Sequence, residues 1–123
     1  MTPSRIARLL PALVALVAAT SSPAFAAGYP AKSIQYLIPF VAGGASDVVA
    51  RLQQQVFSQK FQQEMVVVNR AGGGGALVWQ QLNSLPGDGY TLAGINLPHV
   101  VLQPLEGSVA YKPDDMTSVY WFH

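Results

Sequence analysis

The sequence predicts an α/β fold in which a parallel sheet is covered by helices. Three apolar runs of strand length begin near residues 34, 65 and 90. A glycine turn follows each of the first two runs, and apolar side chains at helical spacing follow each turn. Because parallel strands need a right-handed crossover, the order β-α-β-α-β predicts one sheet with helices packed on its faces.

The first 26 residues are predicted to be a secretory signal peptide and not part of this fold. Arg5 and Arg8 supply a basic start, residues 9–19 are apolar apart from one proline, and residues 24–26 read Ala-Phe-Ala, a small-x-small cleavage site. The apolar run is shorter than the ~20 residues of a membrane-spanning helix. We therefore expect cleavage after Ala26 and a periplasmic location for the mature chain.

The 123 residues allow one domain at most, and their charges nearly balance. Removing Arg5 and Arg8 changes the formal net charge from +1 to about −1. Without a clustered basic face, nucleic acid is not an expected partner. The chain has no cysteine and two histidines, so we expect no disulfide, no multi-histidine metal site and no cofactor.

The first predicted strand, residues 33–40, is almost continuously apolar, as expected for a strand buried on both faces. Pro39 fits only at the end of such a strand, because it cannot donate a hydrogen bond to a neighbour. A helix is expected to begin at Ser46 or at a neighbouring glycine. Its apolar stripe, which we expect to be buried, comprises Val48, Val49, Leu52, Val56, Phe57 and Phe61.

The same pattern repeats in the middle of the chain. Residues 65–68 are predicted to form a second strand, residues 76–85 a second helix with Trp79 in a packing position, and residues 90–95 a third strand. The second helix and the third strand each follow a glycine-containing turn, which separates them from the element before.

The signals are weaker beyond the third strand. Residues 96–99 are predicted to be a loop at its carboxyl end, and residues 100–105 a helix interrupted by Pro104. The apolar run at residues 119–122 predicts the start of a further strand. Because the chain stops inside this run, we expect the domain to be truncated.

The first glycine turn is the main candidate for ligand binding. It leads from a strand directly into a helix, so the first N–H groups of the helix lack intrahelical acceptors and carry the positive end of the helix dipole. Such a junction binds anions, glycine allows close approach, and Ser46 adds a hydroxyl. Asp47 is expected to cap the helix or to hold a water or an ammonium group. The candidate contacts are Ala42, Gly43, Gly44, Ala45, Ser46 and Asp47, and the alternative is a plain strand-to-helix turn.

Two further segments at strand ends contain candidates. Gly73 and Gly74 are expected to contact the other end of the anion, with a flexible turn as the alternative. Asn96 and His99 follow the third strand, at the end where ligands bind in parallel sheets. A lone loop histidine is, however, more often an ordinary hydrogen-bonding residue.

Two enzymatic or nucleotide-binding interpretations find little support. The four-glycine run lacks the G-x-G-x-x-G spacing of a dinucleotide loop. A triad of Ser46, Asp47 and His99 lacks the G-x-S-x-G motif that would present its nucleophile. We therefore expect no catalytic residue.

Four ordered motifs resemble the Bug-type periplasmic solute receptors of tripartite tricarboxylate transporters. These motifs are Tyr29-Pro-x-Lys32, Pro39-Phe-x-Ala-Gly-Gly-x-x-Asp47, Val66-Val-Val-x-Arg70 with its glycine loop, and Asp88-Gly-Tyr-Thr-Leu92. Two positions depart from the usual pattern of the family: Ala71 stands in place of a proline, and Gln103-Pro104 in place of Asn-Pro.

The resemblance implies a two-lobed receptor, not an enzyme, that closes around a small carboxylate ligand. Such receptors have roughly 300 residues, so residues 27–123 are expected to be part of the N-terminal lobe, without the second lobe. The resemblance also implies a full-length monomer and membrane transporter subunits as partners. The alternative from another class is a small secreted α/β enzyme or nucleotide-binding module.

Overall fold

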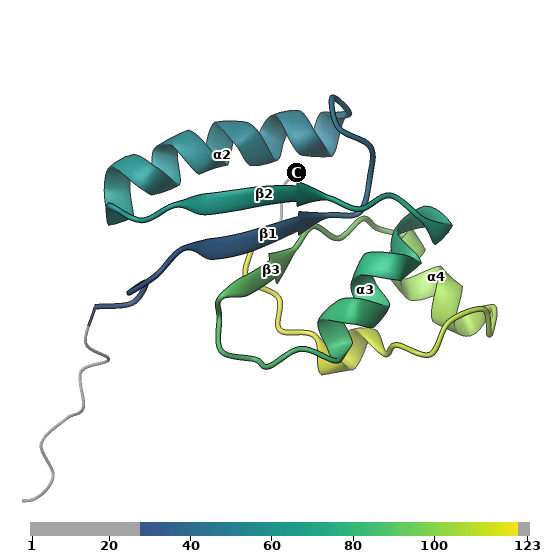
Figure 1. The fold of residues 1–123 in the computed structure, drawn as a ribbon. Coiled ribbons are helices and arrows are strands. Elements are labelled where there is room, and N and C mark those ends of the chain that lie inside the picture. Colours follow the sequence, from purple (N-terminus) through teal and green to yellow (C-terminus); the bar gives the residue numbers. More distant parts are fainter. Residues whose placement is uncertain (1–27, 121–123) are drawn as a thin grey trace, which may run out of the picture.

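The computed structural model describes residues 28–120, which form a three-stranded sheet flanked by helices (Figure 1). The strands are β1 (Ile34–Ile38), β2 (Met65–Asn69) and β3 (Thr91–Ala93). The helices are α2 (Ala45–Phe61), α3 (Ala76–Asn83) and α4 (His99–Leu105), with short 3-10 turns η1 (Gly73–Gly75) and η2 (Pro113–Asp115). The signal peptide predicted for residues 1–26 lies outside the described residues.

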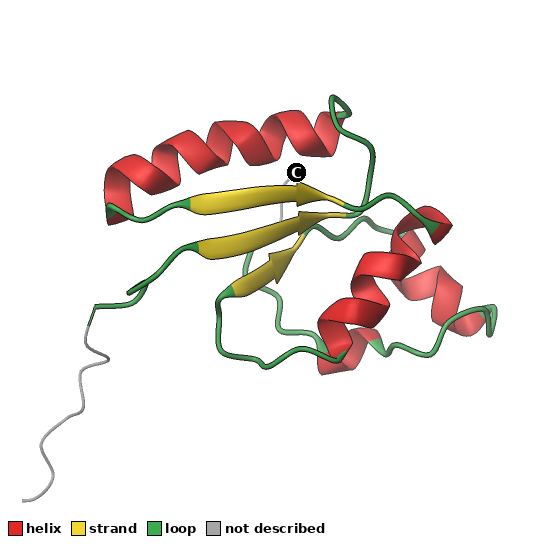
Figure 2. Ribbon diagram, viewed as in Figure 1, coloured by secondary structure: helices red, strands yellow, loops and turns green. Residues whose placement is uncertain are grey.

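The strands are all parallel and lie in the order β2-β1-β3 (Figure 2). Leu37 and Ile38 of the central strand are consecutive, point to opposite faces, and are both buried, so both faces of β1 are covered. The crossover from β1 to β2 and the crossover from β2 to β3 run in opposite lateral directions, which places α2 on one face of the sheet and α3 and α4 on the other. The predicted α/β class with a parallel sheet is confirmed.

The main buried cluster lies on the α3 side of the sheet. It consists of Leu37, Val78, Trp79, Val100 and Tyr111. The Trp79 side chain is fully buried, and its indole N–H donates a hydrogen bond of 2.9 Å to the carbonyl oxygen of Gly94. The predicted packing role of Trp79 is confirmed.

The predicted burial of the α2 stripe is wrong. Members of the stripe that are at least 40% exposed are Val48, Val49, Leu52, Val56 and Phe61. The residues that α2 buries are Asp47 and Ala50, which lie three positions apart on one helix face. The carboxylate of Asp47 is bound by the loop before the helix, which fixes the rotation of α2, and the small side chain of Ala50 then faces the strands.

Two expectations for the C-terminal part also need correction. Pro104 does not interrupt α4, which continues to Leu105, because a proline in the last turn removes only one intrahelical hydrogen bond. Val119 and Tyr120 lie outside the described strands, and they are 75% and 70% exposed. Residues 121–123 lie outside the described range.

The chain entering β1 packs against the chain entering β3. The hydroxyl of Tyr29 donates to the carbonyl oxygen of Gly89, and the hydroxyl of Tyr90 accepts from the N–H of Ala31 at 3.0 Å. The Tyr29 and Tyr90 rings lie 5.2 Å apart, and the Lys32 ammonium lies 4.4 Å from the centre of the Tyr90 ring. Two of the four family-like motifs therefore meet at the amino ends of the strands.

Candidate anion-binding site

The carboxyl ends of the three parallel strands meet at one edge of the sheet (Figure 1). The loops that follow β1, β2 and β3 all leave from this edge, and every candidate site residue lies in one of these loops or in the first turn of the helix that follows it. Because β2 and β3 lie on either side of β1, the chain turns to opposite faces after β1 and after β3. Ligands of open α/β sheets bind at such a switch point.

The loop after β1 presents three free backbone donors. The N–H of Gly43 donates to the Asp47 carboxylate at 2.8 Å, and the N–H of Gly44 donates to the carbonyl oxygen of Val41 at 3.3 Å. The first hydrogen bond of α2 joins the N–H of Val48 to Gly44, so the N–H groups of residues 45–47 have no acceptor within the described residues. These three N–H groups, with the positive end of the α2 dipole, are the candidate anion-binding groups of the turn. Ala42 is exposed beside them.

Asp47 holds this loop in place. Its side chain is buried, and its Oδ2 accepts from Gly43 and from the Nε of Arg51 at 3.1 Å. Arg51 also donates to the Oδ1 of Asn69 at 3.3 Å, and Asn69 donates to the carbonyl oxygen of Phe40 at 3.2 Å. The loop is therefore held at both ends through contacts with α2 and β2.

The same contacts determine the charge of Asp47. The hydrogen bond from the Gly43 N–H, followed by that from Arg51, lowers the pKa of the Asp47 carboxyl below its ordinary value. Oδ1 of Asp47 is buried and has no hydrogen-bond partner within the described residues. Because this oxygen is enclosed, an external water or ammonium group does not reach it in this conformation.

The glycine loop after β2 needs glycine at particular positions. Gly74 and Gly75 have φ values of 60° and 106°, in the left-handed region that favours glycine. A Cβ atom at Gly75 would lie 2.5 Å from the Trp79 ring. Gly75 donates its N–H to Gly72 at 3.0 Å, whereas the N–H groups of Gly73 and Gly74 have no acceptor within the described residues.

Asn96 and His99 lie at the same edge of the sheet but differ in their surroundings. The backbone carbonyl of half-buried Asn96 accepts from the N–H of Val100, and His99 is exposed at the first residue of α4. Within the described residues, no hydrogen bond links Asn96, His99, Gly73 or Gly74 to the loop after β1. The structure brings the candidates to one edge without joining them into a single network.

Four residues of the site region were missed by sequence reasoning. Arg51 and Asn69 hold the loop after β1, and the side chain of Gln103, supported by Tyr111, contacts the loop after β2. The sequence did offer one signal for Gln103. This residue replaces the asparagine that the family usually has before Pro104, so that position 103 keeps an amide side chain.

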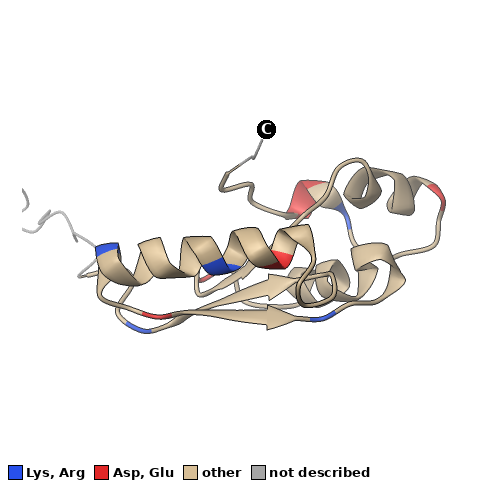
Figure 3. Ribbon diagram, turned by 90° about the horizontal axis from the view of Figure 1, so that it is seen from above, with Lys and Arg blue, Asp and Glu red and all other residues tan. Residues whose placement is uncertain are grey.

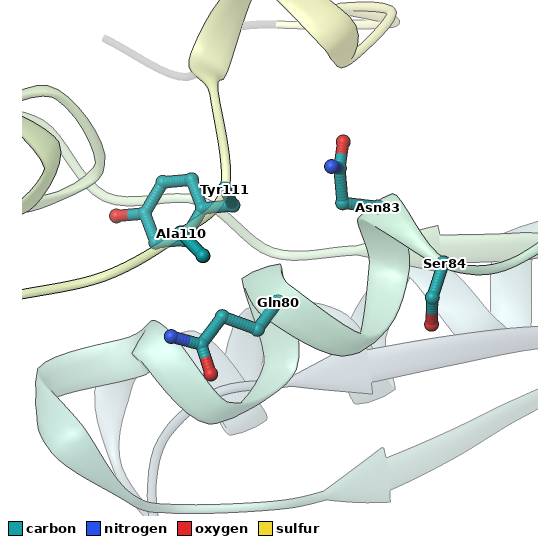
Figure 4. Close-up of a pocket in the computed structure, with 5 residues that line it drawn as sticks. All are labelled: Gln80, Asn83, Ser84, Ala110 and Tyr111. Carbon is teal, nitrogen blue, oxygen red and sulfur yellow. The ribbon is translucent and has the colours of Figure 1, made fainter.

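A pocket of about 260 Å³ lies elsewhere, beside the C-terminal half of α3 (Figure 4). Its lining residues are Gln80, Asn83, Ser84, Ala110 and Tyr111. None of them is charged or was a predicted site residue. The pocket therefore does not coincide with the candidate anion site.

Lysine, arginine, aspartate and glutamate residues are few and lie at separate places along the described ribbon, apart from the adjacent Asp114 and Asp115 (Figure 3). Among residues 28–120, no three histidine, cysteine or acidic side chains are grouped so that they could hold a metal ion. None of the helices within residues 28–120 has both the length and the apolar character needed to cross a membrane.

Known proteins resemble this chain in sequence, although no family model matches it. BugT of Bordetella pertussis is 37% identical over 97 residues, which are 77% of this chain and 30% of BugT. A UPF0065 protein of Agrobacterium vitis is 36% identical over 92 residues, which are 74% of this chain and 27% of that protein. The chain thus spans less than a third of the length of these curated relatives.

Solved structures of binding proteins resemble it in fold. A TctC solute-binding protein from Polaromonas has a TM-score of 0.61 and 29% identity, covering 68% of this chain and 28% of that one. The R. palustris protein Rpa4515 with adipate has a TM-score of 0.55 and 32% identity, covering 58% and 24%. MatC from Rhodopseudomonas palustris with bound malate has a TM-score of 0.50 and 31% identity, covering 53% and 22%.

Fold and sequence together define the class: periplasmic solute-binding proteins. Within this class, the chain belongs to the Bug-type tripartite tricarboxylate receptor family. The resemblance that the four motifs indicated is confirmed.

Proposed function

We propose that this chain is part of an extracytoplasmic solute receptor that binds a small carboxylate for uptake or sensing. The observation that carries this proposal is the loop after β1, where Asp47 and Arg51 fix a turn with free N–H groups at residues 45–47. Three convergent N–H groups at a helix start match the hydrogen-bonding needs of a carboxylate. The adipate and malate of the two neighbours support this ligand class.

The remaining parts of the proposal concern the whole protein. Residues 27–123 would form part of the N-terminal lobe, reached after export and cleavage following Ala26. The receptor would bind its ligand without a catalytic step, as a monomer that delivers the ligand to membrane transporter subunits. The relatives are solute-binding receptors and not enzymes, which supports a binding role.

The proposed site can be tested by nuclear magnetic resonance on the exported, ¹⁵N-labelled chain. Malate or adipate, titrated to millimolar concentration, should shift the amide signals of residues 45–47. Adipamide, which has the length of adipate without its charges, is the matched control and should leave these signals in place. Equal shifts with adipate and adipamide, or no shift at residues 42–47, would contradict carboxylate binding at this turn.

A further inference from the structure

We propose that Gln103 is a positioning residue of the carboxylate site, which turns the Gly73–Gly74 peptide so that the N–H of Gly74 faces the ligand. This inference rests on the proposed function and extends it to the loop after β2. It assigns a task to a residue on α4 that none of the four motifs contains.

The side chain of Gln103 joins the glycine loop to Tyr111. Its Nε2 donates to the carbonyl oxygen of Gly73 at 2.8 Å and lies 3.5 Å from that of Gly74. Its Oε1 accepts a hydrogen bond of 3.1 Å from the hydroxyl of Tyr111. Both ends of the amide are thus in use, and each contacts a group of matching type.

Tyr111 anchors this amide to the core. It is 2% exposed and packs edge-on against Trp79, with ring centroids 5.8 Å apart. Burial raises the pKa of the Tyr111 hydroxyl, which keeps it protonated and able to donate. Because Tyr111 donates to the oxygen of the amide, the NH₂ group of Gln103 must face the glycine loop.

Because the peptide bond is planar, the contact of Gln103 with the Gly73 carbonyl also sets the direction of the Gly74 N–H. In a trans peptide, the carbonyl and the following N–H point to opposite sides. The Gly73 carbonyl points to Gln103, so the N–H of Gly74 points away from α4. Gly74 is exposed, and its N–H has no acceptor within the described residues. A Cβ atom at Gly74 would lie 2.9 Å from the Gln103 amide nitrogen, so the contact also requires glycine there.

The variant Gln103→Glu tests this inference with a nearly isosteric side chain. Above the pKa of the new carboxyl, a carboxylate would face the Gly73 carbonyl and repel it. Below that pKa, the protonated acid regains one donor for Gly73 and keeps an acceptor for Tyr111. The loop is closed by hydrogen bonds from the N–H of Gly75 to Gly72 and from the N–H of Ala76 to the same Gly73 carbonyl. Amide hydrogen exchange of Gly75 and Ala76 should therefore be up to about tenfold faster than in the wild type at neutral pH. It should recover as the carboxyl is protonated.

The control for pH is Gln55→Glu, an exposed position on α2 without a hydrogen bond in the described residues. Other titratable groups near residue 103 are Tyr111, its neighbour Lys112, His99 at the start of α4 and Glu106 just after its end. All of them are shared by the control, so only the Gln103→Glu chain should show loop exchange that follows the added carboxyl. Tyr111→Phe should accelerate amide exchange in the loop less than Gln103→Glu does at neutral pH. This acceleration should not disappear at low pH, because the variant adds no carboxyl.

The second test of the inference is ligand binding. Adipate should shift the Gly74 amide signal in the wild type, and Gln103→Glu at neutral pH should weaken this shift several-fold while the shifts at residues 45–47 persist. If adipate shifts residues 45–47 but never Gly74, the positioning role is wrong and the proposed function stands. Unchanged exchange of Gly75 and Ala76 in Gln103→Glu would likewise overturn it. Loss of exchange protection throughout the sheet, at acid and neutral pH alike, would mark Gln103 as purely structural.

Discussion

The hydroxyl of Tyr29 donates a 2.6 Å hydrogen bond to the carbonyl oxygen of Gly89, 60 positions later in the chain. This contact and the adjoining ring contact with Tyr90 tie the start of β1 to the start of β3. Both partners belong to motifs of the family, and both lie at the edge opposite the ligand loops. These motifs therefore support the pairing of the two strands, away from the candidate site.

Tyr29→Phe should lower the free energy of unfolding by about 1 kcal/mol, because it removes one hydrogen bond and keeps the ring. Tyr29→Ala should cost more, since it also removes the contact with Tyr90. Urea unfolding, followed by circular dichroism, measures both values. Equal stability of Tyr29→Phe and the wild type would show that the hydroxyl contributes nothing to the strand pairing.

Gly75→Ala should destabilise the fold by about 2–3 kcal/mol, since it combines a strained backbone with overpacking. The new Cβ would meet the Trp79 ring at 2.5 Å, and φ at this position is 106°. Gly87→Ala is the matched control, because a Cβ there has no atom within 4 Å. Thermal unfolding of the two variants should separate them clearly, and similar midpoints would argue against the close packing of Trp79 under the loop.

Gly44→Val should abolish the response to adipate at residues 45–47. A branched side chain at the helix start would occupy the approach of the carboxylate, at an expected cost of ~2–3 kcal/mol for a blocked charge-assisted contact. Gly87→Val, far from the carboxyl edge, serves as the control in the same titration. A folded Gly44→Val chain with unchanged shifts would remove this turn from the site.

The lowered pKa of Asp47 predicts a loss of stability in acid. The fold favours the charged carboxylate, so Asp47 contributes stability above its unfolded pKa of about 3.9 and loses it as the pH falls through the lower pKa of the folded state. Asp47→Asn should therefore reduce the acid dependence of the unfolding midpoint.

The control for this measurement is Asp114→Asn, an exposed position that makes no hydrogen bond or ion pair in the described part of the chain. It should keep the acid dependence of the wild type. If the two variants have the same dependence on pH, the contacts of Asp47 with Gly43 and Arg51 do not stabilise its charge.

The order of elements could be predicted because each has a local cause. Glycine turns separate the apolar runs of the strands from segments in which apolar residues recur at helical spacing. The central strand is apolar on both faces, as at Leu37 and Ile38. The rotation of α2 could not be predicted from its apolar stripe, since a single buried carboxylate, Asp47, decides which face meets the sheet. Such a choice depends on contacts with Gly43 and Arg51 that only the folded loop provides.

The local part of the candidate site could also be predicted, but its long-range contacts could not. The donors at residues 45–47 follow from the strand-glycine-helix pattern, but the engagement of the Gly43 N–H by Asp47 does not. The contact of Gln103 with Gly73 spans 30 positions and depends on the buried place of Tyr111. No local pattern in the sequence encodes a contact of this kind.

The indole of Trp79 occupies the space that a side chain at position 75 would need. A larger residue at position 75 therefore meets two obstacles, the positive φ and the Trp79 ring, and a smaller side chain at position 79 removes the second of them. Among receptors of this family, the two positions should accordingly change together. A Gly75→Ala, Trp79→Leu double variant should lose less stability than the sum of its single changes.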